Sequence, residues 1–379
     1  MTAIRCILLC LLFSWACFAQ SDRDAMFRSR ADTLFGNAVD PAGPGCSVFV
    51  QIDGRTLYQK SFGYADLKRG DRFTENTVAN LGSITKTFVA YGILMLMEQG
   101  KLSLDDSVIK YFPDFKNKEI GRKVKIRHLL THTSGLPDCR NVDGDSVFFL
   151  TANDRQNFFP VSQTDTLEFE PGTHWDYSNP SFNALALIIG QVSGMKWQKF
   201  IEQNIFKPSG MNDSKITDYA YPSEGVSHGY RIRENPMVPA SNTTATAAPI
   251  TKRIYDEYDY GEYPTFNAAG NGGVWSSIND LRKYYDAIQH ATFADTGLIR
   301  LSETLWHPPN WADTLPPTNG FSWFVKDGAI YHSGHQAGFT AQFTMIPEKN
   351  FLLIFESNIE DLYEVQVKLV SILKEMNYL

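Results

Sequence analysis

The chain has 379 residues, a formal net charge of −7 and an aromatic content of 13%, and this length suggests about two structural lobes with ample core. The aromatic content excludes disorder over most of the chain. The negative charge, with no block of Lys and Arg, excludes a nucleic-acid-binding surface and attraction to anionic lipid. No sequence repeat with a period of about 20–50 residues is present, which argues against solenoids and propellers.

The N-terminus has the pattern of a secretory signal peptide, and we expect residues 1–19 to be removed on export. Arg5 supplies a positive charge ahead of the apolar run 6–19, which is shorter than the ~20 residues that a membrane-spanning helix needs. Cys17 and Ala19 are small residues of the kind that precede a cleavage site. An uncleaved membrane anchor and lipidation of Cys17 stay open as alternatives. The expected location is periplasmic or secreted, with no membrane span after signal removal.

The first hundred residues predict a helix, a β-hairpin and a long apolar helix, over 24–35, 46–52 with 55–62, and 83–99. Asp53 and Gly54 between the two strands are a two-residue hairpin signal. Gly100 follows the second helix at the position where a left-handed residue commonly ends a helix. The apolar run 88–97 is too short to cross a membrane, so the second helix is expected to be buried.

Two cysteines remain after signal removal, Cys46 and Cys139. A disulfide is chemically reasonable in an exported protein, but nothing in the sequence places the two residues in contact. A disulfide and two inert thiols therefore both stay open.

The middle of the chain predicts helical segments separated by long loops. Helical periodicity covers 182–194 and 197–206. The stretch 215–266 is rich in Pro, Ser, Thr and Tyr, and it predicts a loop that is either a solvated surface or the wall of a cleft. The loop 138–168 is a second expected wall.

The C-terminal part turns to short aromatic and β-branched runs, which predict strands over 321–325, 329–332, 340–347 and 351–355. A helix over 280–290 precedes them and a helix over 362–376 closes the chain. Strands at both ends with helices between predict an α+β fold, in which a central antiparallel sheet from both chain ends is flanked by helices. We expect one domain over 20–379, with an α/β lobe from 20–82 and 268–379 and a mostly helical lobe over 83–267.

The most informative motif is Ser83-Ile84-Thr85-Lys86 at the start of the long helix. Residues i and i+3 share one helix face, so a hydroxyl and an amine lie within hydrogen-bond reach. Serine needs an adjacent base to act as a nucleophile, and burial makes it easier for a lysine to lose its proton. The helix start also favours negative charge at Ser83. Alone, the pattern is weak, and a capping serine with a surface lysine is its ordinary interpretation.

Two further motifs carry polar groups suited to the same chemistry. Tyr177-Ser178-Asn179 offers a phenol that a nearby lysine charge can convert to a base, and an amide that can bind a substrate amide. His332-Ser333-Gly334-His335 lies at the end of a predicted strand, where Gly334 lets a substrate approach the strand edge. The backbone N–H groups of His335 and Ser83 can together form an oxyanion hole.

Other catalytic and metal motifs are missing. The sequence contains no G-x-S-x-G elbow, no Walker A sequence and no G-x-G-x-x-G run opening a helix. His128 and His132 have the i, i+4 spacing of a zinc motif, but Leu129 stands where its general base belongs. The cysteine spacing does not suggest a zinc site either, so neither a metal nor a cofactor is expected.

Taken together and in this order, the three polar motifs resemble those of the penicillin-recognising serine hydrolases. The closest pattern is the group that holds class C β-lactamases, serine D-Ala-D-Ala carboxypeptidases and β-lactamase-fold esterases. The similarity covers roughly residues 25 to 378, and its flanking stretches are Lys125 through Pro137, Pro171-Gly172, Ser193-Gly194, Pro208 through Met211, Gly272 through Ser277 and Asp280-Leu281.

The resemblance implies a role for each matching residue. Ser83 is the residue acylated, and Lys86 and Tyr177 share the proton transfers. Substrate binding falls to the side chain of Asn179 and to the segment His332, Gly334 and His335. His332 stands where many β-lactamases have lysine, and histidine is mostly neutral at pH 7.

The expected function is therefore that of an exported serine hydrolase that works through an acyl-enzyme on a small-molecule or peptide substrate. A D-Ala-D-Ala-type peptidase and a carboxylesterase rank nearly level. A β-lactamase, or a catalytically silent sensor of β-lactams or cell-wall fragments, is the alternative. The sequence leaves the oligomeric state open.

Overall fold

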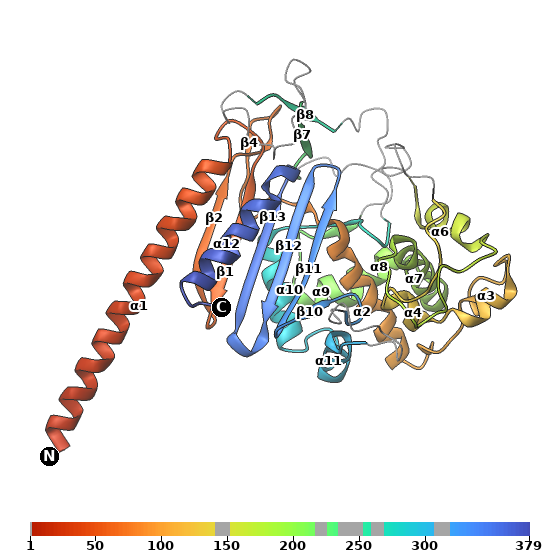
Figure 1. The fold of residues 1–379 in the computed structure, drawn as a ribbon, viewed down its shortest axis with the longest axis horizontal. Coiled ribbons are helices and arrows are strands. Elements are labelled where there is room, and N and C mark those ends of the chain that lie inside the picture. Colours follow the sequence, from red (N-terminus) through yellow and green to blue (C-terminus); the bar gives the residue numbers. More distant parts are fainter. Residues whose placement is uncertain (1, 141–151, 217–225, 234–252, 259–268, 307–318) are drawn as a thin grey trace.

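The computed structural model describes residues 2–140, 152–216, 226–233, 253–258, 269–306 and 319–379. Its centre is a six-stranded antiparallel sheet in the order β10-β11-β12-β13-β1-β2 (Figure 1). The strands are β1 Cys46–Ile52, β2 Arg55–Phe62, β10 Phe324–Lys326, β11 Ala329–Gln336, β12 Phe339–Ile346 and β13 Phe351–Ser357. Because β1 pairs with both β2 and β13, the sheet joins the two ends of the chain, which confirms the predicted α+β architecture.

The β1–β2 hairpin has the predicted bounds and turn. Asp53 and Gly54 have φ angles of 51° and 75°, the left-handed values that a two-residue hairpin loop requires at both positions. A glycine at the second of them adopts that conformation without strain.

The C-terminal strands differ from their predicted bounds. β11 extends to Gln336 and pairs with β12 along its whole length, so residues 332–335 lie inside a strand and not beyond its end. The predicted strand over 321–325 begins only at Phe324, because Ser322 has a φ of 74° and donates its N–H to the Leu130 carbonyl of another segment. Local β-propensity did not reveal that tertiary contact.

Helices α1 (Thr2–Ala38) and α12 (Tyr363–Glu375) pack against each other and cover one face of the sheet (Figure 1). Phe27 and Phe35 of α1 are fully buried there with Leu353 of β13. The predicted helices over 24–35 and 362–376 are thus confirmed. The N-terminal part of α1 extends away from the body of the molecule (Figure 1).

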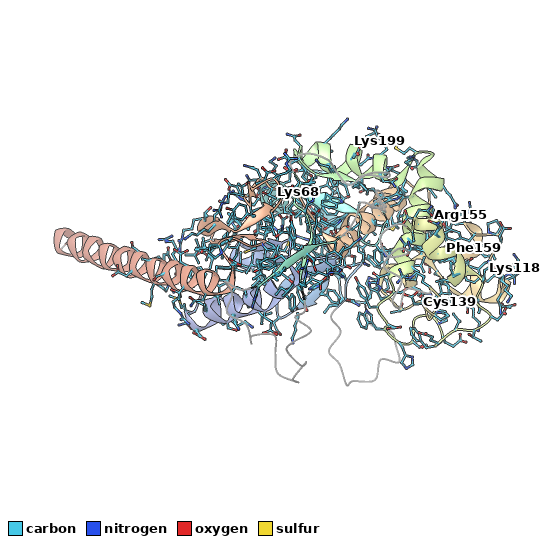
Figure 2. All side chains as sticks on the ribbon, turned by 90° about the horizontal axis from the view of Figure 1, so that it is seen from above. Lys68, Lys118, Cys139, Arg155, Phe159 and Lys199 are labelled. Atoms are coloured by element: carbon cyan, nitrogen blue, oxygen red, sulfur yellow. The ribbon has the colours of Figure 1, made fainter. Side chains whose placement is uncertain are left out.

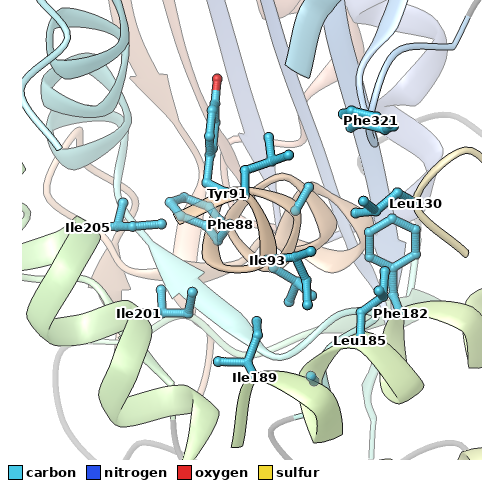
Figure 3. Close-up of a cluster of buried hydrophobic side chains, with 14 of the residues drawn as sticks. Phe88, Tyr91, Ile93, Leu130, Phe182, Leu185, Ile189, Ile201, Ile205 and Phe321 are labelled. Carbon is cyan, nitrogen blue, oxygen red and sulfur yellow. The ribbon is translucent and has the colours of Figure 1, made fainter. Parts of the chain in front are cut away.

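The other face of the sheet is covered by α10 (Ile278–Gln289), which contacts β13 and β1. The long helix α2 (Thr85–Glu98) packs against α7 (Asn179–Ser193) and α8 (Trp197–Ile201) from the middle of the chain. Figure 3 shows Phe88 and Ile93 of α2 surrounded by apolar side chains that include Ile189 and Ile201. Twelve residues of α2, Thr85 through Leu96, are buried, which confirms the predicted buried helix. Gly100 follows with a φ of 67°.

The remaining helices are α3 Lys118–Lys123, α4 Ile126–Leu130, α6 Asp154–Ser162, α9 Lys207–Ser209 and α11 Thr296–Glu303. The short strands are β3 Tyr64–Asp66, β4 Asp71–Arg72, β5 Ala79–Asn80, β6 Lys215–Ile216, β7 Tyr230–Ile232, β8 Tyr255–Glu257 and β9 Val274–Ser276. The expected loops are therefore partly regular. Helix α6 lies within 138–168, and β6, β7 and β8 lie within 215–266, whose residues 217–225, 234–252 and 259–266 fall outside the described part.

Both cysteines considered for a disulfide are free. Cys46 is buried in β1, whereas Cys139 is exposed among the helices far from α1 (Figure 2). Within the described residues, no helix is both long enough and apolar enough to cross a membrane.

Candidate active site

Ser83 is a partly exposed residue within a buried stretch of the chain. It lies in a single 3₁₀ turn, Gly82–Ile84, directly ahead of α2, and it is the only residue between Thr77 and Leu96 that is not buried. The turn is held by the Gly82 N–H, which donates to the side chain of Asn80 at 2.8 Å. The Ser83 hydroxyl is therefore presented to the surface by a rigid and fully packed support.

Lys86 follows one turn later and is fully buried. Its Nζ lies 3.0 Å from the Oγ of Ser83 and donates to the carbonyl oxygen of Asn271 at 2.7 Å. Burial holds the pKa of Lys86 well below its ordinary value, and the charge of Arg140 lowers it further. The site thus favours a neutral amine next to the hydroxyl, which is the form able to accept its proton.

Tyr177 comes from the segment before α7, where Ser178 caps the helix by accepting the N–H of Ser181. The Nζ of Lys86 lies 5.0 Å from the centre of the Tyr177 ring, and Ser83 lies close enough to the phenol to oppose part of the shift in its pKa. Burial raises the pKa of Tyr177. The expectation that a lysine charge converts this phenol to a base is therefore wrong, because both groups are desolvated and each is driven to its neutral form.

His132 supports Tyr177, a role that sequence reasoning missed. Its ring stacks on the Tyr177 ring with the centroids 4.4 Å apart, and its Nδ1 accepts the N–H of Ser178 at 3.0 Å. His132 is buried with a φ of 57°, an unusual backbone conformation for a residue other than glycine. The only available signal was its place inside the 125–137 stretch, which the resemblance had singled out without a role for this residue.

His332 in β11 is buried and uncharged. Its Nδ1 lies 2.6 Å from the Ser333 carbonyl oxygen, so Nδ1 carries the proton and Nε2 is left with a lone pair. Burial lowers the pKa of His332 to about 3, helped by the charge of Lys86. The Nε2 atom is buried without a partner among the described residues.

Strand β11 lies directly against the turn that carries Ser83. A Cβ on Gly334 would lie 1.9 Å from the Leu81 carbonyl oxygen and 2.9 Å from the Ser83 nitrogen, and a Cβ on Gly82 would lie 2.7 Å from the His335 nitrogen. Both glycines are thus required by close backbone approach. The Ser83 and His335 backbone nitrogens are thereby brought near each other. The His335 side chain is exposed and contacts the ring of Tyr363.

Asn179 is the first residue of α7 and is half-buried. Its side chain has no hydrogen-bond partner within the residues that the structure describes. Contacts therefore bring Ser83, Lys86 and Tyr177 together, and His332 lies close enough to Lys86 for the lysine charge to lower its pKa. The backbone of Gly334 and His335 lies against the Ser83 turn. Within the described residues, no contact joins Asn179 to the Ser83 hydroxyl. His128 and His132, considered and rejected as zinc ligands, instead accept backbone N–H groups of Lys125 and Ser178.

The buried neutral His332 predicts a loss of stability on acidification. The unfolded chain takes up the histidine proton near pH 6.5, whereas the folded chain resists it down to about pH 3, so stability falls as the pH drops through this window. His332→Gln should reduce the loss of unfolding free energy between pH 7 and pH 5 by about 2 kcal/mol, measured by urea unfolding. An equal loss in both proteins would show that the folded state protonates His332 as readily as the unfolded chain does.

Comparisons with known proteins identify relatives over most of the chain. A family model described as Beta-lactamase matches residues 27–369. The chain is 28% identical over 348 residues to Penicillin-binding protein 4* of Bacillus subtilis (strain 168), covering 88% of this chain and 72% of the relative. It is 24% identical over 325 residues to Protein flp of Staphylococcus aureus (strain MW2), covering 84% of this chain but only 60% of that relative.

Among solved structures, the D-amino acid amidase from Ochrobactrum anthropi SV3 complexed with L-phenylalanine amide superposes with a TM-score of 0.69. The two chains are 20% identical, and the match covers 93% of this chain and 99% of the amidase. At that level of identity the likeness concerns the fold.

Proposed function

Because the chain belongs to the Beta-lactamase family and is an acyl-transferring serine hydrolase, we propose that Ser83 is its nucleophile and that its substrates are amides or esters without a carboxylate. The observation that carries the first part is the 3.0 Å separation of Ser83 Oγ from a buried Lys86 Nζ. The second part rests on the neutral His332.

Acylation begins at the Ser83 hydroxyl. The neutral Lys86 amine accepts the hydroxyl proton while Oγ bonds to the carbonyl carbon of the substrate. The backbone N–H groups of Ser83 and His335 stabilise the oxyanion that forms. The Tyr177 phenol, which is neutral, relays the proton from the lysine to the departing nitrogen or oxygen, and the substrate bond breaks.

Deacylation reverses these roles. A water molecule loses a proton to the Lys86 amine and attacks the acyl carbon, and the bond to Ser83 Oγ breaks as that oxygen regains a proton. Asn179 binds the polar group of the acyl chain. No step in this scheme calls for a metal or an organic cofactor.

The charges around Ser83 favour a substrate without a carboxylate. A neutral His332 offers a lone pair and no cation. The Arg140 guanidinium, which lies close enough to lower the pKa of Lys86, is already engaged. It donates to Asp138 at 2.8 and 2.6 Å and to Asn157 at 2.9 Å. Neither His332 nor Arg140 therefore offers a free cation to a substrate carboxylate.

Aromatic rings between Tyr177 and His332 supply an apolar surface. Trp175 lies 6.4 Å from Tyr177 and 6.5 Å from Phe324, ring centre to ring centre, and Phe324 lies 5.2 Å from His332. Such rings bind aliphatic or aromatic groups at low entropic cost. The solved structure of a D-amino acid amidase with L-phenylalanine amide supports amides of apolar amino acids as the first substrates to test, with short-chain esters beside them.

A substrate panel tests this proposal. We expect p-nitrophenyl butyrate and D-phenylalanine amide to be turned over with a higher kcat/KM than a D-Ala-D-Ala peptide or nitrocefin, both of which carry a carboxylate. His332→Lys should shift the ratio of kcat/KM for the ester to kcat/KM for a carboxylate substrate by about 10–100-fold in favour of the carboxylate substrate, because a charge-assisted hydrogen bond contributes about 1.5–3 kcal/mol.

The same panel decides among the alternatives. Preferred cleavage of the D-Ala-D-Ala peptide would assign a peptidase, and preferred hydrolysis of nitrocefin a β-lactamase. Tight binding of a fluorescent penicillin with neither an adduct nor turnover would assign a sensor. We also propose that residues 1–19 are cleaved on export, which mass spectrometry of the exported protein tests directly.

A further inference from the structure

Asp154, the first residue of α6, connects four separate segments of the chain. Its side chain is buried. Its Oδ1 accepts the side-chain amide of Asn183 in α7 at 2.8 Å and the backbone N–H of Gly270 at 2.7 Å. Its Oδ2 accepts the indole N–H of Trp197 in α8 at 2.8 Å. One carboxylate thus joins α6, α7 and α8 to the turn that precedes β9.

That turn contributes directly to the catalytic centre. Gly270 is followed by Asn271, whose carbonyl oxygen accepts from Lys86 Nζ at 2.7 Å. The N–H groups of Gly272 and Gly273 both close the turn onto the Ala269 carbonyl. The placement of the Asn271 carbonyl therefore depends on where Gly270 is held.

Two kinds of contact hold Gly270 in place. A Cβ at this position would lie 2.5 Å from the Ala186 Cβ and 2.7 Å from the Phe182 carbonyl oxygen of α7, so the turn lies directly against that helix. The Gly270 N–H is in addition bound by Asp154. A side chain at this position would collide with α7, so glycine is required here.

We propose that Asp154 is a positioning residue of the active site, which fixes the 269–273 turn so that the Asn271 carbonyl aims the Lys86 amine at Ser83. The inference rests on the proposed function, in which Lys86 is the proton acceptor. The other groups that act electrostatically on Lys86 are Arg140, His132 and His332. Asp154 acts on the lysine through backbone placement and not through its charge.

Asp154→Ala is the test. Without the carboxylate the Asn271 carbonyl is free to move, and the Lys86 amine is no longer held in its orientation toward Ser83. The kcat/KM for p-nitrophenyl butyrate should therefore fall about 100-fold. A hydrogen bond to a carbonyl oxygen also favours the charged form of an amine. Loss of the bond to the Asn271 carbonyl should therefore lower the pKa of Lys86 and move the acid limb of the kcat/KM profile about one pH unit lower. Rates are expressed per active site, titrated with a fluorophosphonate, so that unfolded protein does not count.

Two matched variants separate positioning from stability. Asp154→Asn keeps an acceptor oxygen facing Gly270 and replaces the oxygen that accepts from Trp197 with an amide nitrogen. It should retain kcat/KM within about fivefold and keep the wild-type pH profile. Trp197→Phe removes the contact on the other carboxylate oxygen and should lower the melting temperature without moving the profile. If Asp154→Ala does not fold, Gly270→Ala disturbs the same turn from the side of α7 and should shift the acid limb in the same direction.

A wild-type rate per titrated site and an unshifted pH profile in Asp154→Ala, with only the melting temperature lowered, would overturn the proposal. Equal losses in Asp154→Ala and Trp197→Phe would overturn it as well. Failure of the proposed function is distinguishable from both outcomes, because then the wild-type protein itself forms no adduct at Ser83.

Discussion

Ser83→Ala should lower kcat for p-nitrophenyl butyrate at least ~10³-fold while the protein keeps its wild-type melting temperature. The reaction needs an oxygen that bonds to the substrate carbonyl, and alanine has none, so only activity that does not use the acyl-enzyme survives. Ser83 is only partly buried, and Lys86 keeps its hydrogen bond to the Asn271 carbonyl when the Ser83 oxygen is removed, so the loss of one oxygen should cost the fold little. Steady-state kinetics and thermal unfolding of the same samples measure both effects.

Ser371→Ala serves as the matched control, because it removes an equivalent hydroxyl from the exposed face of α12, far from the site along the fold. It should retain full activity and form the same fluorophosphonate adduct as the wild-type protein. A Ser83→Ala protein that still turns over the ester, or still forms the adduct elsewhere, would remove Ser83 from the mechanism.

The features that were predictable from sequence are those determined by neighbours along the chain. The β1–β2 hairpin needs only alternating strands and the Asp53-Gly54 turn, and the helix at 363–375 needs only its apolar periodicity. The spacing of Ser83 and Lys86 on one helix face is likewise a local property. The grouping of Tyr177 and His332 with them came from the family resemblance, since no local rule brings such distant segments together.

What the sequence left hidden depends on burial and on contacts between distant segments. The pKa of Tyr177 is raised and not lowered, because desolvation of the phenol outweighs the opposing effect of the nearby Ser83. His132 and Asp154 carry no motif of their own. The role of His132 follows from its stacking on Tyr177, and that of Asp154 from the hydrogen bond that it accepts from Asn183. Both contacts depend on the packing of distant segments.

Lys86→Met should lower kcat/KM at least ~10³-fold and, at pH 7, make the protein more stable. Methionine fills much of the volume of the lysine stem but cannot accept a proton, so general-base catalysis is lost. The folded state of the wild-type protein holds the pKa of Lys86 well below its ordinary value of 10.5, so at neutral pH folding discharges or desolvates an ammonium that the unfolded chain keeps solvated. An apolar side chain removes that cost.

The direction in which stability changes with pH distinguishes this electrostatic explanation from one in which methionine stabilises the fold only by packing better. With the unfolded chain binding the proton more tightly, wild-type stability rises as the pH increases toward 10.5, and Lys86→Met should lack that rise. Lys86→Arg should be inactive and less stable, since a guanidinium stays charged where it is buried. Urea unfolding at pH 7 and pH 9 measures these differences. A less stable Lys86→Met protein would mean that the amine is present for structure, and the mechanism would need another base.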